Sequence, residues 1–592
     1  MKREEISKQY QWKMEDLYAT NEAWEAEFSE LQNGIETMKQ FEGTLAESAE
    51  NLFNMLKKSD ELNQLAERVY VYANQRLHEN TANAYYQGLS GRAQMLLVQM
   101  SEASSYIEPE ILDIPEAKLE EMLKDEKLQN YEVYIRRMLR KKEHILSKEM
   151  EELLAGVAEV AEGPKDTFMM FNNADLKFPV ITGEDGEPVE ITHGKFVKLL
   201  ESQNRDVRKA AFQGLYETYK KYKNTLAATY RANVKQAGFF AKARKYESSL
   251  SAALAGSHIP TAVYDSLIES VHAHLPALHE YVKVRKEKLG VEELHMYDLY
   301  VPMVGEADKK IPYEEAKEIV LKGLTPLGED YQELLKKGFT DGWIDVYENE
   351  GKRSGAYSWG AYGTHPYVLL NYQDNLNNVF TLAHEMGHAL HSYHSDETQD
   401  YIYAGYKIFV AEVASTCNEA LLIHHLLEQS KDKKEKAYLL NYFLEQFRGT
   451  LFRQTMFAEF EKCAHAKSEA GEPLTAEVLC DLYYELNKKY FGENIVVDQE
   501  IAMEWARIPH FYTPFYVYQY STGFSAAIAI SSKILKGEPG IVEKYKKFLS
   551  SGSSLDCIDL LKICDVDMTT KEPVEEALKV FESTLKEFLE II

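Results

Sequence analysis

The sequence has little of what marks secreted, membrane-spanning or nucleic-acid-binding proteins. Its 592 residues include only five cysteines, an odd number without CxxC spacing, which argues against a disulfide framework or a thiolate metal site. No stretch approaches about eighteen uncharged apolar residues, and the first residues lack the apolar segment of a signal peptide. The net charge is −28 and the sequence contains no long basic run, so it lacks the positive residues that binding to a phosphate backbone requires. We therefore expect a cytoplasmic protein with buried thiols and with neither a membrane nor a nucleic acid as partner.

The composition is that of an ordinary globular protein. Hydrophobic residues make up 45% of the chain, aromatic residues 12% and charged residues 27%, so the chain should fold throughout. Its length exceeds the size at which one hydrophobic core stops growing. We expect several lobes with room for a deep interior site, without internal repeats.

Hydrophobic periodicity predicts a mainly helical fold. Apolar residues recur every three or four positions over residues 21–162, as expected of successive amphipathic helices. Two short strands around a Gly-containing turn are predicted within residues 176–192. This hairpin suggests a domain boundary, with an N-terminal helical region at 1–193 and a catalytic domain at 194–592.

The second predicted domain begins and ends with helices. Helical periodicity covers residues 194–288 and returns from residue 378. Between them, the aromatic segments of residues 295–372 contain several Gly and Pro, and we expect a small sheet there. Its clearest strand is residues 366–372, after a Gly-rich stretch at 355–363.

The strongest motif is His384-Glu385-Met386-Gly387-His388, an HExxH sequence among apolar residues. Residues four apart lie one turn above each other on a helix, so His384 and His388 can bind a single Zn²⁺. Glu385 can then take a proton from an attacking water and return it to the leaving amine, as in HExxH metalloproteases. The motif therefore predicts a zinc peptidase with one Zn²⁺ per chain.

The third metal ligand is predicted to be Glu412. His394 has the spacing of another zinc family but lacks the turning glycine, since position 391 is a histidine; on a continuing helix it would lie about 15 Å from His384. We interpret His391 as a packing residue or a partner of a ligand. The acidic residues Asp396, Glu397 and Asp400 are interpreted as a solvated turn.

Glu412 lies 24 residues after His388 in an apolar segment, where a carboxylate needs a metal or another partner. Glu419 comes seven residues later and shares its helical face. Its distance from His388 is too long for the Asn-Glu pair of thermolysin-like enzymes. We expect Glu412 to bind zinc and Glu419 to accept a hydrogen bond from a ligand imidazole.

An aromatic cluster follows at residues 507–520, with His510 and four tyrosines. A protonated phenol or imidazole can donate to the oxyanion that forms during peptide hydrolysis. A simple aromatic core is the alternative for each tyrosine. His510, which lies between two prolines, is the better functional candidate.

Together these motifs resemble oligoendopeptidase F, within the thimet oligopeptidase-like zinc peptidases. The resemblance rests on HExGHALH at residues 384–391, on residues 409–419 and on the His-Phe-Tyr segment from His510, and it extends over nearly the whole chain. It implies a mainly α, multi-helix zincin-type body with a small β-sheet and a deep central channel that holds the HExxH helix. It also implies endopeptidase action on short oligopeptides, with residues 366–372 as the edge strand on which substrate lies.

The resemblance also implies roles for single residues. His384, His388 and Glu412 correspond to the zinc ligands and Glu385 to the general base. The carbonyl and transition-state donors correspond to His510 and Tyr518, with Tyr512 as a further candidate. The spacer after His510 is shorter than in thimet oligopeptidase, so the choice among Tyr512, Tyr516 and Tyr518 stays open.

Two other functions compete with an endopeptidase. A carboxypeptidase-type exopeptidase could use the same zinc scaffold, whereas no glycine-methionine-glutamate motif of an aminopeptidase precedes His384. A non-catalytic peptide-binding protein could keep the metal site, but it would have no need of Glu385. The sequence does not indicate an oligomeric state.

Overall fold

The computed structural model describes residues 1–305 and 310–592, which form two compact units. Each unit is built from three segments that are distant in sequence. Unit 1 comprises Met1–Glu143, Lys309–His425 and Ile530–Asp565, and unit 2 comprises His144–Asp308, Leu426–Ala529 and Val566–Ile592. The HExxH motif therefore belongs to unit 1 and the His510 cluster to unit 2.

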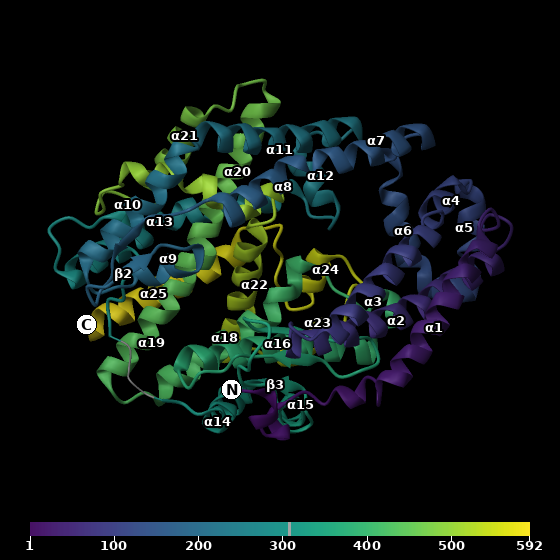
Figure 1. Cartoon of the computed structure of the whole chain (residues 1–592), viewed down its shortest axis with the longest axis horizontal. Helices are drawn as coiled ribbons and strands as arrows, with labels where there is room; N and C mark the ends of the chain where they lie inside the picture. Colours follow the sequence, from purple (N-terminus) through teal and green to yellow (C-terminus); the bar gives the residue numbers. More distant parts are fainter. Residues whose placement is uncertain (306–309) are drawn as a thin grey trace. The chain divides into compact units, whose positions relative to one another are not determined.

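Unit 1 consists of helices and one small sheet (Figure 1). Its helices are α1 (Asn21–Met38), α2 (Ala49–Glu79), α3 (Ala84–Ala103), α4 (Ile107–Asp113), α5 (Glu116–Met122), α6 (Glu132–Arg140), α14 (Tyr313–Gly323), α15 (Glu329–Thr340), α16 (Leu376–Thr398), α17 (Tyr401–Ala404), α18 (Ile408–Gln429, completed in unit 2), α23 (Ile541–Leu549) and α24 (Cys557–Lys562). Helices α1, α2 and α3 pack against one another, and α16 packs against α14, α15, α23 and two strands. The HExxH helix is thus surrounded by its own unit.

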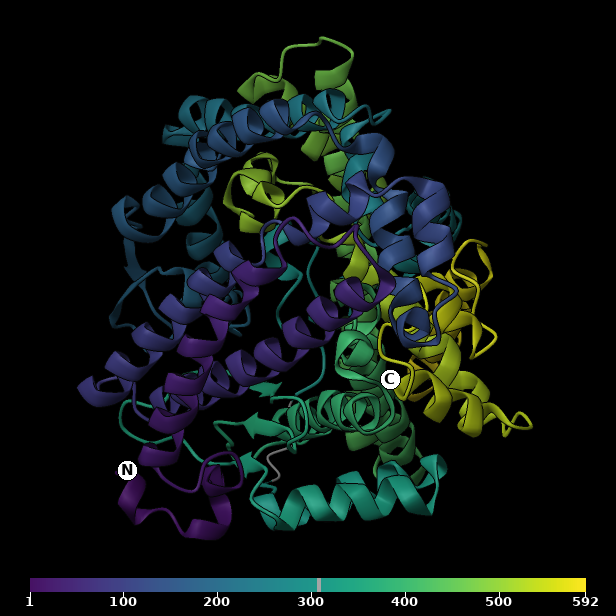
Figure 2. The same ribbon diagram turned by 90° about the vertical axis from the view of Figure 1, so that its right-hand side faces the viewer.

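The sheet of unit 1 has the strand order β3-β5-β4. Strand β3 (Ile344–Asp345) is parallel to β5 (Tyr367–Leu369), and β4 (Tyr357–Trp359) is antiparallel to β5. These strands are the short teal arrows in Figure 2. The predicted strand at residues 366–372 is confirmed, but its predicted place at the sheet edge is wrong, because β5 is hydrogen-bonded on both sides and fully buried. The antiparallel edge is β4, within the Gly-rich stretch.

Unit 2 is helical apart from a hairpin. Its helices are α7 (Lys148–Ala161), α8 (Gly163–Met170), α9 (His193–Leu200), α10 (Arg205–Lys221), α11 (Lys223–Ala243), α12 (Ser249–Ala255), α13 (Thr261–Leu289), α19 (Lys433–Gln446), α20 (Arg453–Glu469), α21 (Ala476–Phe491), α22 (Tyr518–Leu535, completed in unit 1) and α25 (Glu572–Ile591). Strands β1 (Val180–Thr182) and β2 (Pro188–Glu190) form the predicted antiparallel hairpin. The domain boundary proposed at residue 193 stays a prediction.

The mainly α fold with a small sheet is confirmed. The mixed region of residues 295–372 contains the sheet, but it also contains α14 and α15, which the sequence analysis did not distinguish. No helix among the described residues has the length and hydrophobicity needed to cross a membrane. All five cysteines are unpaired, and Cys417, Cys557 and Cys564 are buried whereas the other two are half-buried.

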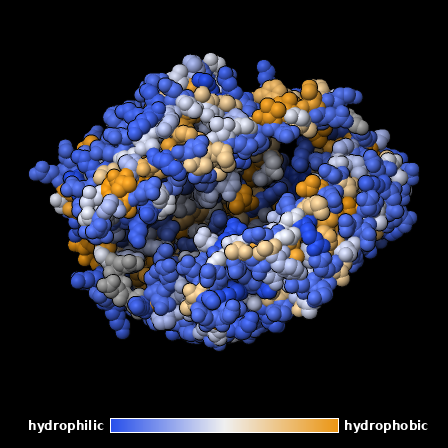
Figure 3. All heavy atoms as spheres, in the orientation of Figure 1, coloured by the Kyte–Doolittle hydropathy of each residue, from blue (hydrophilic) through white to orange (hydrophobic). Residues whose placement is uncertain are grey.

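Hydrophilic residues cover most of the face seen in Figure 3. Apolar residues lie between them in small groups. One such group belongs to α7, where Met150, Leu153 and Val160 are exposed. Most of this face is therefore polar, with its apolar residues in small groups.

Candidate metal and catalytic site

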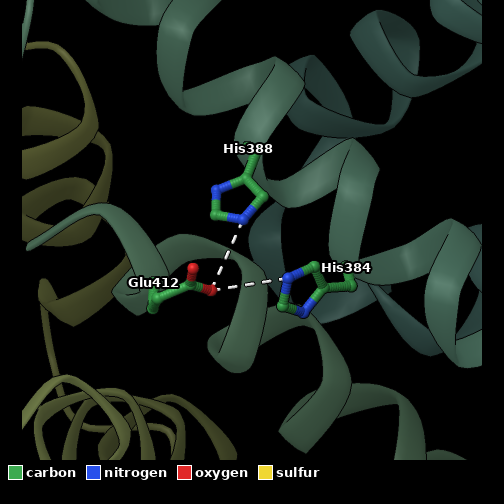
Figure 4. A group of neighbouring side chains, drawn as sticks. All are labelled: His384, His388 and Glu412. Carbon is green, nitrogen blue, oxygen red and sulfur yellow. Dashed lines mark ion pairs between the residues drawn. The ribbon is translucent and has the colours of Figure 1, made fainter. Parts of the chain in front are cut away.

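Three side chains of unit 1 converge in the way a metal site requires. Oε2 of Glu412 lies 3.4 Å from Nε2 of His384 and 3.4 Å from Nε2 of His388. One ligand atom from each residue falls within 4.8 Å of the other two, and no other such group occurs in the described part of the chain. Figure 4 shows both imidazoles on α16 pointing toward the carboxylate on α18. Two imidazoles and one carboxylate are a donor set that can hold a divalent metal ion.

Helix α16 places the two histidines one turn apart. The side chain of Asn375 caps the helix by accepting a hydrogen bond from the backbone N–H of Asn378 at 2.9 Å. The helix buries an apolar face formed by Val379, Phe380, Leu382, Ala383, Met386, Ala389 and Leu390. This burial fixes the rotation of the helix, so His384 and His388 face α18 with their ring centroids 4.8 Å apart.

Helix α18 approaches α16 closely enough for Glu412 to reach both histidines. Gly387 makes this possible, since a Cβ at this position would lie 2.6 Å from Cα of Ser415. The amide of Asn418 donates to the backbone oxygen of Ala383 at 3.0 Å and ties the helices together. The hydroxyl of Ser415 donates to Oε2 of Glu412 at 3.0 Å and helps to orient the carboxylate. Sequence reasoning missed these supports.

The carboxylate of Glu419 holds one ring of the site. It accepts a hydrogen bond from Nδ1 of His384, the contact predicted from the sequence, which leaves Nε2 directed at Glu412. Burial lowers the pKa of His384, but the hydrogen bond and charge of Glu419 raise it to about 9. Burial raises the pKa of Glu412, but its contacts with His388 and His384 lower it to about 2. The opposite charges of His384 and Glu412 thus favour the observed arrangement of the group.

Glu385 has the environment of a proton acceptor. It is only 7% exposed and follows the first histidine on α16. Burial raises the pKa of its carboxyl, while the nearby imidazoles of His384 and His388 act in the opposite direction. Its position and raised pKa suit a group that gains and loses a proton during a reaction near neutral pH.

The other nearby candidates lie outside the group. Helix α16 continues through His394, which stacks near Tyr331, as the missing glycine predicted. His391 is 1% exposed and stacks on Tyr406 with ring centroids 3.8 Å apart. Burial and neighbouring histidines lower its pKa to about 3, so it is a neutral packing residue.

The predicted solvated turn at Asp396 is wrong, because α16 extends to Thr398. The buried hydroxyl of Ser395 donates to the backbone oxygen of Ala404 and anchors this last helical turn to α17. Asp396 is half-buried, whereas Glu397 and Asp400 are exposed. The three acidic residues therefore have different surroundings.

The His510 cluster lies in unit 2. His510 is exposed in the short 3-10 helix Pro509–Tyr512, with the half-buried rings of Tyr516 and Tyr520 each 6.1 Å from its ring. Tyr512 is 7% exposed and stacks on Phe168 at 4.3 Å. Tyr518 is 2% exposed. Among the histidine and tyrosines of this cluster, His510, Tyr516 and Tyr520 are thus the ones that solvent reaches in unit 2.

The loop of this cluster has an unusual backbone. Phe515 adopts a φ of 58°, in the left-handed region that favours glycine. Its N–H donates to Oε1 of Glu461 on α20 at 2.9 Å. Glu461 is fully buried, and burial raises its pKa to about 8. A buried carboxyl of α20 therefore fixes the loop that carries Tyr516.

Comparisons with known proteins show the family to which the chain is related. The profile of Peptidase family M3 matches residues 198–580, and that of Oligopeptidase F matches residues 110–178. Oligopeptidase PepF of Bacillus subtilis is 49% identical over 591 residues, which cover 100% of this chain and 88% of the relative.

Solved structures give the same result. A protein from Chlamydophila abortus has a TM-score of 0.94 and 35% identity, with 100% of both chains covered. Oligoendopeptidase-F from Enterococcus faecium has a TM-score of 0.76 and 41% identity, covering 96% of this chain and 99% of that one. With family profiles matching most of its length and close relatives spanning all of it, the chain belongs to peptidase family M3, and it is a metallopeptidase.

Proposed function

We propose that the protein is a zinc metalloendopeptidase that hydrolyses internal bonds of short peptides, with Glu385 as general base. The observation that carries the proposal is the convergence of His384, His388 and Glu412 beside Glu385. The names of relatives, which include oligopeptidase and oligoendopeptidase, support oligopeptides as substrates. The five unpaired cysteines fit a reducing, cytoplasmic setting.

The donor set of this site fits one Zn²⁺ per chain. His384, His388 and Glu412 would hold the ion, and Glu419 would keep the ring of His384 in the tautomer that presents Nε2. When bound, zinc supplies positive charge that polarises the peptide carbonyl and makes water a better nucleophile.

Glu385 performs the proton transfers in this proposal. Its carboxylate accepts a proton from the attacking water as the new C–O bond forms. It then delivers that proton to the leaving nitrogen as the C–N bond breaks. Burial raises the pKa of this carboxyl, which makes it a stronger proton acceptor and suits it to both steps.

Two further parts of the chain complete the proposal. His510 and one tyrosine would donate hydrogen bonds to the oxyanion. Tyr518 and Tyr512 are the tyrosines that the sequence predicted for this role. Burial of those two rings favours Tyr516, which is only half-buried and lies beside His510 in unit 2. The edge strand β4 would bind the substrate backbone as an added strand, a mode that tolerates many sequences.

The central test is Glu385→Gln. The variant should bind about one Zn²⁺ per chain, like the wild type, while kcat falls about 100-fold to 10,000-fold. Glu333→Gln, at an exposed position on α15, is the matched control and should change neither property. Unchanged kcat in Glu385→Gln with full zinc occupancy would contradict the role of the base.

The same assay separates an endopeptidase from a carboxypeptidase. Peptides of about eight to twelve residues with acetylated and amidated ends should be cut internally, and mass spectrometry identifies both fragments. A carboxypeptidase would leave these peptides intact but shorten versions with a free C-terminus. Intact blocked peptides would therefore remove the endopeptidase proposal.

A further inference from the structure

Unit 1 contains a cavity of about 480 Å³, lined in part by the residues of α16 that follow the metal-binding histidines. Its wall is formed by Leu56, Ser59, Asp60, Asn63, Glu67, Ile107, Tyr134, Ser358, Trp359, Gly360, Tyr362, Thr364, Pro366, Ser392, Asp396, Tyr401, Ile402, Ala404, Gly405 and Tyr406. This volume is in the range of small-ligand pockets. Every wall residue belongs to unit 1.

The cavity is lined in part by the metal-binding helix α16 and by the edge strand β4, which we propose binds the substrate backbone. Ser392 comes one turn after His388 on α16, and Asp396 one turn later, at about 6 and 12 Å along the helix axis. Trp359 is the last residue of the edge strand β4. An extended peptide advances about 3.3 Å per residue, so the cavity is reached about two to four residues from the bond that is cut.

The charges of the wall determine what fits inside. Asp60, Glu67 and Asp396 contribute three carboxylates, and the wall contains no lysine, arginine or histidine. Asp396 forms no hydrogen bond or ion pair within the described part of the chain. Burial and the nearby charge of Glu67 raise its pKa to about 7, which reflects a carboxylate without a cationic partner.

The chemistry of the wall indicates that an organic cation fits better than a metal ion. The wall carboxylates do not form a compact ligand group, because the only such group among the described residues is the one at His384. The wall also includes Trp359 and several tyrosines, whose ring faces attract ammonium and guanidinium groups. In addition, the buried hydroxyl of Ser358 lacks a hydrogen-bond partner among the described residues.

We propose that this cavity is a substrate subsite that binds a cationic group of the peptide, about two to four residues from the cleaved bond. The cation is either a lysine or arginine side chain or the free amino terminus, which share the same recognition chemistry. The proposal rests on the peptidase function proposed above and names a class of peptides that this enzyme prefers.

The test uses end-blocked peptides that differ at one position, with lysine replacing norleucine at each site within four residues of the cut bond. A second series contains no lysine and has either a free or an acetylated amino terminus. For at least one pair, the wild type should show about a tenfold higher kcat/KM for the cationic peptide, chiefly through KM. That factor corresponds to about 1.4 kcal/mol, as expected for a partly desolvated ion pair.

The double variant Glu67→Gln with Asp396→Asn removes two charges at nearly constant side-chain shape. It should reduce the preference to less than about twofold while cleaving the norleucine peptide at the wild-type rate. Asp113→Asn with Glu333→Gln removes two exposed charges of unit 1 outside the cavity and should retain the full preference. High salt should weaken the preference in the wild type.

The outcomes separate this subsite from the peptidase function itself. A preference that survives in the double variant overturns the subsite, and so does the absence of any preference in the wild type. Either result leaves hydrolysis of the norleucine peptides intact. Failure of the wild type to cut any blocked peptide would instead overturn the proposed endopeptidase function.

Discussion

Replacing Gly387 by alanine should weaken metal binding without removing any ligand. The new Cβ would lie 2.6 Å from Cα of Ser415 and 2.8 Å from the backbone oxygen of Ala414. Carbon contacts are ordinarily about 3.5–4.0 Å, so α18 must withdraw by about 1 Å. Metal–ligand distances vary by only about 0.2 Å, and Glu412 moves with α18. We expect zinc affinity to fall at least 100-fold and unfolding to become easier by about 1–3 kcal/mol.

The assay is competition for zinc with a chromophoric chelator, combined with chemical unfolding. Gly91→Ala on α3 is the control, because a Cβ there would meet nothing within 4 Å. That change should keep zinc affinity and raise stability by up to about 1 kcal/mol, as alanine favours a helix. Hydrolysis by the Gly387→Ala variant should recover at high zinc concentration in proportion to occupancy. Wild-type zinc affinity in this variant would refute the idea that the close helix contact sets the ligand geometry.

Three further predictions follow from the same structure. Glu419→Gln should lower zinc affinity about 10- to 100-fold, because His384 loses the charged partner that orients its ring; an unchanged dissociation constant would contradict this role. Removal of zinc by chelation should lower the thermal stability, and free zinc at about 100 times its dissociation constant should restore about 2.7 kcal/mol; a melting temperature that is independent of zinc would be inconsistent with a folded-state site. Burial raises the folded pKa of Glu461 to about 8 from 4.5, against the opposing hydrogen bond from Phe515. The contribution of this proton to stability is therefore complete below about pH 4.5 and is lost as the pH rises to about 8. Between these values the wild type should lose up to about 1.4 kcal/mol of unfolding free energy per pH unit relative to Glu461→Gln, and parallel stability curves would show that the carboxyl is not buried as described.

The metal-binding residues could be predicted from local features of the sequence. The spacing of His384 and His388 follows directly from helical periodicity, and Glu412 was detectable as a charge within an apolar segment. The role of Gly387 could also be predicted from the sequence. Glycine in a helix interior costs about 1 kcal/mol relative to alanine, so its presence between two ligand positions indicates a close contact.

Tertiary relations were harder to predict. An apolar strand such as Tyr367–Leu369 suits the centre of a sheet, but a single strand does not reveal its neighbours. The polar residues after Asp396 resemble a turn, yet the buried hydroxyl of Ser395 extends the helix past it. Tyr516 is half-buried whereas Tyr512 and Tyr518 are buried, and the sequence around the three tyrosines does not reveal this difference.

The three-segment construction of unit 1 also constrains how the protein can fold during synthesis. Residues 1–143 leave the ribosome first, but the last segment of their unit, Ile530–Asp565, follows roughly 400 residues later. At about 5–20 residues per second, this interval lasts tens of seconds. Unit 2 is interleaved in the same way, and its third segment is Val566–Ile592. We therefore expect the nascent chain to depend on chaperones, and unit 1, which holds the metal site, to be completed only after residue 565 has been synthesised.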